Sequence, residues 1–194
     1  MTGISVRRRR ISWENIRLRW LLILAAAAIA CSNYDSNSNF VSSTASGDLA
    51  PDLTVSMFQG QDVVGGEKVT LSGLIGGRPI VLNFWAGLCP PCRAEMPDLQ
   101  AFNDKFEDRA LLLGIDLGQF TGLGNTDEAK ELLAELEITY PAGFTEDANV
   151  VRGYQVLGMP TTIFIDANGE IFNKWTGALN RAVLEEKTLE MLAQ

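Results

Sequence analysis

The sequence predicts an α/β fold in which helices flank a mixed central β-sheet. Segments typical of buried strands alternate with segments whose apolar residues recur at helical spacing, and a hairpin pattern follows late in the chain. A third observation places a site on this scaffold: the buried run over residues 80–86 is followed at once by the sequence Cys-Pro-Pro-Cys, which opens a helix. We therefore expect chemistry at the end of a central strand.

The first half of the domain predicts three strands and one helix. Residues 50–61 alternate apolar and polar side chains as a strand would, and residues 68–79 predict a short strand and a turn. Residues 80–86 form a continuous apolar run, which is typical of a buried central strand. The helix after the cysteines is expected over 90–109 with a kink at Pro97, because apolar residues recur at helical spacing: Met96, Leu99, Phe102 and Phe106.

The second half continues the alternation. Residues 110–118 predict another buried strand, and residues 118–126 a flexible loop whose glycines lack the Lys-Ser/Thr of a P-loop. Residues 126–138 predict a helix capped by Thr126. The remaining elements are a short helix over 148–158, a hairpin over 161–177 that turns at Asn168-Gly169, and a closing helix over 181–194.

Residues 1–30 have the pattern of a signal peptide or membrane anchor. Four consecutive arginines precede an uncharged apolar run over residues 20–30, which is shorter than the ~20 residues that span a bilayer as a helix. Ala28-Ile29-Ala30 is a small-x-small cleavage site, and it resembles a bacterial lipobox in which Cys31 would be lipidated, although Ala28 stands where Leu is usual. An ordinary cleaved signal, an uncleaved anchor and a cytosolic helix are the alternatives.

A flexible linker is expected over residues 31–49, because this stretch is rich in Ser and Asn and poor in large apolar residues. The folded domain is then expected over 50–194. Residues 1–30 hold six Arg and one Glu, so residues 31–194 keep 10 basic and 23 acidic residues, a net charge of −13. Such a surface disfavours binding to nucleic acid and to anionic membranes.

The chain contains three cysteines and no histidine. Mechanisms that need an imidazole base, His-ligated zinc and proximal-His haem are therefore excluded. One C-x-x-C pair supplies too few ligands for a zinc site unless two chains share it, and Arg93 stands where a c-type haem site needs His. A purely structural disulfide would close a very small loop and constrain little. We expect no cofactor and no metal.

A helix N-terminus gives the cysteine pair its expected chemistry. Unpaired N–H groups and the helix dipole stabilise a thiolate there, and the thiolate is the attacking species. Cys89 precedes the first turn and is the expected exposed nucleophile, while Cys92 lies one turn on, more buried but within reach of the first sulfur. Pro90 and Pro91 cost little in a first turn, where N–H groups have no helical partner.

Four sequence stretches together resemble the thioredoxin superfamily, and within it the exported TlpA/ResA-type thiol-disulfide oxidoreductases. They are APDLTV, NFWAGLCPPCRAEMP, GMPTTIFIDANGEI and WTG, in matching order over residues 50–194. A proline directly before a buried strand, Pro160, by itself suggests a cis bond only weakly. Together with the strand–cysteine–helix arrangement it becomes informative.

The resemblance implies a role for each matching position. Cys89 matches the nucleophile and Cys92 the resolving cysteine, Pro160 the cis-proline that faces their disulfide, and the Met159 backbone a dock for a substrate peptide. Glu95 matches a carboxylate that the subfamily keeps near its cysteines; a solvated helix carboxylate is the alternative. Two positions depart from the pattern: Asn83 stands where thioredoxin has a buried Asp, and Leu88 where Trp is common. Trp85 is expected to pack in the core or to shield the pair.

The expected function is the reduction of disulfides. The Cys89 thiolate attacks a partner disulfide, and Cys92 then releases the reduced partner. Glu95 and an uncharged Pro-Pro pair both favour a reductant over an oxidant. The signal pattern of residues 1–30, together with the resemblance, predicts an extracytoplasmic bacterial protein, in the periplasm or on the outer face of the cell membrane and tethered by a lipid or anchor. Its partners would be disulfide-bearing exported proteins, apocytochrome c among them, and a membrane thiol-disulfide electron donor.

Two other functions are possible on the same fold. A thiol peroxidase would need a Thr-x-x-Cys frame and a nearby Arg; Arg93 is close, but Ala86 stands three residues before Cys89. A non-catalytic metal or haem chaperone would bind its cargo without using the Cys89 sulfur.

Overall fold

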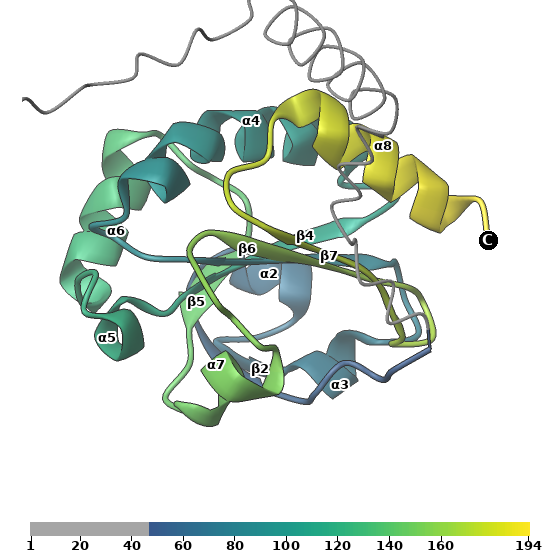
Figure 1. The fold of residues 1–194 in the computed structure, drawn as a ribbon, viewed down its shortest axis with the longest axis horizontal. Coiled ribbons are helices and arrows are strands. Elements are labelled where there is room, and N and C mark those ends of the chain that lie inside the picture. The colour runs from purple at the N-terminus through teal and green to yellow at the C-terminus, as the bar shows by residue number, and fades with distance from the viewer. Residues whose placement is uncertain (1–46) are drawn as a thin grey trace, which may run out of the picture. The chain divides into compact units, whose positions relative to one another are not determined.

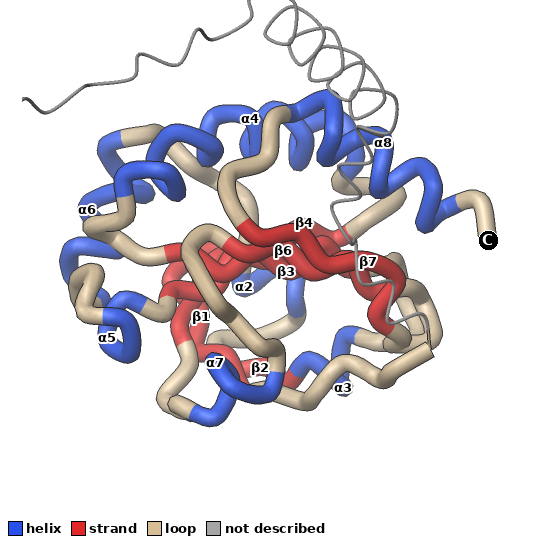
Figure 2. The backbone as a smooth tube through the Cα atoms, viewed as in Figure 1, coloured by secondary structure: helices blue, strands red, loops and turns tan. Residues whose placement is uncertain are grey.

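A computed structural model describes residues 47–194 and shows a mixed β-sheet between two layers of helices (Figures 1 and 2). The expected signal peptide, most of the expected linker and Cys31 lie outside the described residues. Within 47–194, no helix has both the length and the apolar character needed to cross a bilayer.

The sheet has seven strands in the order β2-β1-β5-β4-β3-β6-β7. Central β3 pairs in parallel with β4 and antiparallel with β6. Every residue of β3 and β4 is buried, so the two continuous apolar runs are confirmed as central strands. The strands are β1 (Thr54–Gln59), β2 (Lys68–Thr70), β3 (Ile80–Trp85), β4 (Leu111–Asp116), β5 (Ala142–Phe144), β6 (Thr161–Ile165) and β7 (Ile171–Thr176).

Helices cover both faces of the sheet and divide the core into two apolar clusters. Side chains of α4, α6 and α8 pack in one cluster, and those of α2, α3 and α7 in the other; Figure 1 shows α4 and α8 on the opposite side of the sheet from α3 and α7. The helices are α2 (Gln61–Val64), α3 (Leu71–Leu74), α4 (Pro90–Phe106), α5 (Gly118–Thr121), α6 (Thr126–Glu135), α7 (Asn149–Gly153) and α8 (Arg181–Leu192).

Three local expectations are corrected. The turn after β2 is the one-turn helix α3, and the loop over 118–126 contains the one-turn helix α5. The N-cap of α6 is Asn125, not Thr126, because the Asn125 side chain accepts hydrogen bonds from the N–H groups of Asp127 and Glu128. Glu128 in turn accepts from the Asn125 N–H, which completes a capping box that Thr126 could not form one residue later.

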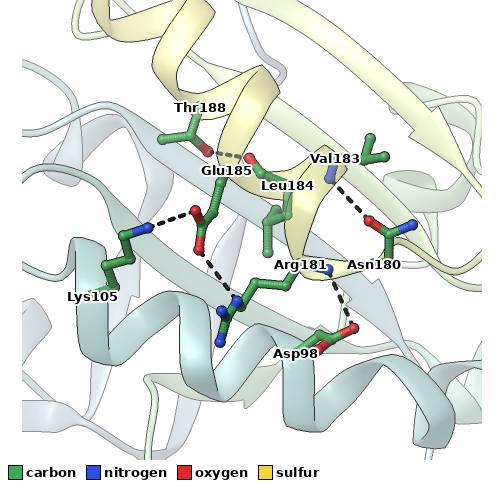
Figure 3. Close-up of polar contacts among 8 residues, drawn as sticks. All are labelled: Asp98, Lys105, Asn180, Arg181, Val183, Leu184, Glu185 and Thr188. Carbon is green, nitrogen blue, oxygen red and sulfur yellow. Dashed lines mark hydrogen bonds and ion pairs between the residues drawn. The ribbon is translucent and has the colours of Figure 1, made fainter.

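The expected amphipathic helix is confirmed as α4, whose four periodic apolar residues are all buried. Figure 3 shows how the closing helix α8 is held against it: the Arg181 N–H donates to the Asp98 carboxylate at 3.2 Å, and Lys105 pairs with Glu185 at 2.6 Å. Surface pairs of this kind contribute little to stability, so the apolar contacts between the helices dominate their packing.

Candidate active site

The cysteine pair lies where β3 meets α4. β3 ends at Trp85, and Cys89 is the N-cap of α4, with its Sγ accepting a hydrogen bond from the Cys92 N–H at 3.3 Å. Pro90 and Pro91 fill the first turn, where no intrahelical bond is lost. The two sulfurs are joined in a disulfide with the Cα atoms 5.3 Å apart. The structure therefore shows the oxidised form of the pair.

Both cysteines are more enclosed than the sequence suggests. The expectation that Cys89 is exposed is wrong in degree: it is 3 % exposed, and Cys92 is 0 % exposed. The reason is that both cysteines belong to an apolar core cluster, which also includes the fully buried Trp85, so core side chains pack around them. Cys89 alone of the pair lines a surface groove, so a partner can approach only this sulfur.

The groove has a volume of about 400 Å³ and carries no charged side chain in its lining. One wall comes from Thr121 and Leu123, after β4, and the other from residues 156–159, before β6. Leu157 is 88 % exposed on that second wall, and Leu88 beside Cys89 is 55 % exposed. The surface next to the disulfide is therefore apolar, within a domain that is strongly acidic elsewhere.

The Met159–Pro160 peptide bond is cis. The Met159 N–H and C=O have no hydrogen-bond partner in residues 47–194, although the neighbouring Pro160 C=O accepts from the Gly177 N–H. Met159 lines the groove together with Cys89. A strand-like peptide laid in the groove would find these two backbone groups free, as the resemblance implies for a docking position.

Glu95 is buried on α4, one helical turn beyond Cys92 on the same face, which rules out the solvated alternative. Its Oε1 accepts a hydrogen bond from Asn83 Nδ2 at 2.8 Å, and its Oε2 accepts from the Leu179 N–H at 2.9 Å. Both partners are donors, so the arrangement suits an ionised carboxylate. Leu179 ties the β7–α8 connection to the helix that carries the cysteines.

Burial raises the pKa of Glu95 to about 7, against the opposing effect of the two hydrogen bonds from Leu179 and Asn83. A carboxyl group with a pKa near neutrality can both accept and return a proton at physiological pH. Glu95 does not line the groove and lies on the side of Cys92, the cysteine that the groove does not expose.

Asn83 and Thr162 extend the hydrogen-bond network of Glu95 into the sheet. They are opposite residues of the β3–β6 pair, and Asn83 Nδ2 also donates to Thr162 Oγ1 at 3.0 Å. Asn83, which the resemblance places where thioredoxin has an Asp, carries no charge, and Glu95 is the buried carboxyl group beside it. Sequence reasoning missed Thr162 and Leu179, because only the register and the β7–α8 connection bring them to the site.

A second buried carboxyl, Asp116, was also missed. It ends β4 directly beside the end of β3, and its Oδ1 accepts from the Gly118 N–H at 3.1 Å. Burial raises its pKa to about 6, against hydrogen bonds from Gly118 and Gly87, and Glu128 adds repulsion. The available signal was its position, since the carboxyl ends of adjacent parallel strands meet at one edge of a sheet.

The loop before Cys89 depends on a glycine. A Cβ at Gly87 would come within 2.7 Å of backbone atoms of Glu128 and Ala129, so only glycine lets this loop rest on the start of α6. The Leu88 N–H donates to the Leu123 C=O at 2.8 Å, which joins the loop to the first groove wall. Arg93, one residue past Cys92, forms an ion pair with Glu135 on α6.

The chain is similar to proteins of one known family. Residues 46–174 match the AhpC/TSA family. The chain is 34 % identical over 168 residues to the thiol-disulfide oxidoreductase ResA of Oceanobacillus iheyensis, an alignment that covers 85 % of this chain and 82 % of the relative. It is 27 % identical to the ResA of Halalkalibacterium halodurans, over 62 % of this chain and 66 % of that one.

A solved structure shows the same fold. The crystal structure of a thiol:disulfide interchange protein DsbE from Chlorobium tepidum superposes with a TM-score of 0.64 at 28 % identity, covering 76 % of this chain and 97 % of that one. The expected thioredoxin-like fold is confirmed. The chain belongs to the AhpC/TSA family, and within the thioredoxin-like fold it is a thiol-disulfide oxidoreductase related to ResA.

Proposed function

We propose that this protein reduces disulfide bonds in extracytoplasmic proteins with the Cys89–Cys92 dithiol. The observation that carries the proposal is the asymmetry of the pair: both sulfurs sit at the N-terminus of α4, but only Cys89 reaches the groove. A partner disulfide can therefore meet Cys89 and not Cys92. This order of contact is what a nucleophile and a resolving cysteine require.

The proposed reaction starts from the reduced pair. The Cys89 thiolate attacks one sulfur of the partner disulfide, the partner S–S bond breaks, and the other partner sulfur leaves as a thiolate that takes up a proton. A mixed disulfide now joins Cys89 to the partner. Cys92 gives up its proton and attacks Cys89 Sγ, the bond between Cys89 and the partner breaks, and the second partner sulfur leaves as a thiolate that takes up a proton. Two electrons have passed to the partner, and the enzyme holds the Cys89–Cys92 disulfide seen in the structure.

Glu95 is the proposed acceptor of the Cys92 proton. Support comes from its burial on the Cys92 face of α4 and from a pKa of about 7, which suits proton exchange at neutral pH. A buried carboxylate near the sulfurs also disfavours a thiolate, and no charged residue lies between the cysteines. Both features favour the disulfide form of the enzyme, and so a reducing role.

Export and tethering are proposed from the sequence of residues 1–49. A reductant in an oxidising compartment needs electrons from elsewhere, so we propose a membrane thiol-disulfide transporter as the donor. Oxidised exported proteins, including apocytochrome c during cytochrome c maturation, are the proposed substrates. Nucleic acid is not a proposed partner, because residues 31–194 carry a net charge of −13.

The two alternative functions have less support. Ala86 stands where a thiol peroxidase would need Thr, and the Arg93 guanidinium is already paired with Glu135. For a metal chaperone, residues 47–194 gather no group of three His, Cys, Asp or Glu side chains that could hold an ion.

A redox titration tests the proposal. The full chain is equilibrated in glutathione or dithiothreitol buffers, and the fraction of Cys89–Cys92 disulfide is measured by thiol alkylation and mass spectrometry. We expect a potential more negative than about −200 mV and turnover of insulin disulfides by the reduced protein. A potential near about −120 mV, as for a strong oxidant, would contradict the reducing direction. Peroxide consumption at a rate exceeding insulin reduction would favour the peroxidase.

A further inference from the structure

Lys174 lies on the edge strand β7, and its ammonium group reaches the chain that follows α7. Its Nζ donates to the Tyr154 C=O at 2.8 Å and to the Gln155 C=O at 2.5 Å. No carboxylate pairs with it in the part of the chain that the structure describes. Its half-buried position lowers the pKa of Lys174 through desolvation. The Lys174 ammonium group is therefore held by the two backbone carbonyls and not by an ion pair.

The segment that Lys174 binds needs support from outside. Gln155 has a φ of 49°, in the left-handed region that costs a non-glycine residue roughly 1 kcal/mol or more. The C=O groups of Tyr154 and Gln155 come just after the last turn of α7, where backbone N–H partners run out. The ammonium group donates hydrogen bonds to both carbonyls and so stabilises the turn that the chain makes at Tyr154 and Gln155 after α7.

The residues immediately after this reversal form the second wall of the groove. Residues 156–159 lead from Gln155 to the cis-proline, with Leu157 almost fully exposed. The wall is held at its start by the Val156 N–H, which donates to the Val151 C=O at 2.8 Å. At its end, Thr161 Oγ1 donates to the Gly158 C=O at 2.7 Å. With few hydrogen bonds along its length, the wall takes its position from the bonds at its two ends and from the Val156 and Met159 side chains, which pack against the core.

We propose that Lys174 is a positioning residue for protein substrates: it fixes the wall of residues 156–159 relative to the disulfide. On β7, Lys174 lies opposite Ile163 of β6, and β6 begins directly after Pro160, at the end of the wall. The ammonium group binds the chain just before the start of the wall. Both ends of the wall are therefore connected to the β6–β7 pair. The inference rests on the proposed function, because it concerns docking of a polypeptide beside Cys89. A small disulfide, which needs only the sulfur, does not depend on the wall.

The test compares Lys174→Met with Lys174→Arg in the full chain. Methionine keeps the apolar stem and removes the donors, while arginine keeps the donors. For Lys174→Met we expect the KM for insulin to rise by about 3- to 10-fold, as for the loss of one or two hydrogen bonds, with kcat nearly unchanged. The rate with glutathione disulfide should stay within about twofold, and Lys174→Arg should restore the KM.

Hydrogen exchange provides a readout independent of turnover. In Lys174→Met the Val156 amide should exchange faster, while amides of β3 and β4 keep their protection. An unchanged KM and an unchanged Val156 amide would overturn the inference, and so would an equal loss of rate toward glutathione disulfide. A wild-type protein that reduces no insulin would instead contradict the proposed function, and the exchange result would still decide the role of Lys174.

Discussion

The two halves of the site differ in how they meet solvent. The chemical half consists of Cys89, Cys92 and Glu95, none of which is more than 3 % exposed. The docking half consists of Leu88 and the wall of residues 156–159, where Leu157 is 88 % exposed. The chemical half is fixed by a central strand and a long helix, and the docking half by short connections after β3 and before β6.

This difference predicts a division of labour. Changes in the chemical half should alter the reaction with every disulfide, large or small, because they act on the sulfurs or on their protons. Changes in the docking half should alter only the reaction with polypeptides, because only a chain long enough to lie in the groove meets that wall. Pairing a protein substrate with a small disulfide therefore separates the two halves experimentally.

The largest effect is expected for Cys89→Ser. Loss of the one sulfur that reaches the groove should lower the rate with insulin and with glutathione disulfide by at least about 1000-fold. Cys92→Ser should instead stall after the first step and accumulate a mixed disulfide through Cys89, detected as a mass increase that dithiothreitol reverses. A covalent adduct that peptide mapping places on Cys92 in Cys89→Ser, or none on Cys89 in Cys92→Ser, would reverse or remove the assigned order.

The next effect concerns Glu95 and the pH dependence of stability. Its pKa in the folded, oxidised protein is about 7, above the 4.5 of an unperturbed Glu side chain, so between these two pH values the native state holds a proton that the unfolded state has lost. Stability should therefore fall as pH rises from about 4.5 to 7, by up to about 3 kcal/mol from this group. Glu95→Gln should flatten that slope in urea unfolding.

Asp116 and a surface carboxylate provide the controls for this measurement. In Glu95→Gln, the raised pKa of Asp116, about 6, should still make stability fall with rising pH, by less than Glu95 does. This remaining decrease should end at about pH 6. Exposed Glu135, changed to Gln, should leave the Glu95 slope intact. In turnover at pH 7, Glu95→Gln should slow both substrates by about 10- to 100-fold if the carboxyl group takes the Cys92 proton. An unchanged slope in Glu95→Gln would mean that Glu95 stays ionised throughout.

The docking half should show a smaller effect that depends on the substrate. Leu157→Ser removes an exposed apolar side chain from the groove wall, so the KM for insulin should rise by about 3- to 10-fold while glutathione disulfide is unaffected. Leu189→Ser on α8, where Leu189 is 45 % exposed, is the matched control and should change neither. Equal effects of the two variants would show that exposed apolar area, rather than the groove, determines insulin binding.

The two halves also differ in how far the sequence predicts them. The strand–cysteine–helix order is visible because a continuous apolar run over residues 80–86 and helical spacing after Cys92 are strong local patterns. The contacts of Glu95 are not, because the Asn83–Thr162 pairing depends on strand register and the Leu179 N–H comes from a connection 84 residues away. The prediction could name the carboxyl group but not its burial.

The docking half was almost invisible in the sequence. Met159 and Pro160 were identified through a motif, but Leu157 and Lys174 belong to short or edge elements with no periodic pattern. The exposure of Cys89 was misjudged for a related reason, since a helix N-terminus indicates electrostatics and not what packs over it. Local patterns predict a central scaffold well and predict poorly which loops close over it.

The smallest effect is expected for Arg93. It tests whether this residue, next to Cys92 in sequence, belongs to the chemical half. Arg93 follows Cys92 in sequence, but its guanidinium points to Glu135 in an exposed ion pair, so its charge is offset and solvated. Arg93→Ala should change the thiolate reactivity of Cys89, measured with iodoacetamide across pH, by less than about threefold. Glu135→Ala frees the guanidinium and is the complementary variant. A decrease beyond about 30-fold in Arg93→Ala would mean that a side-chain cation, and not the α4 terminus, activates the sulfur, which is the arrangement a peroxidase would need.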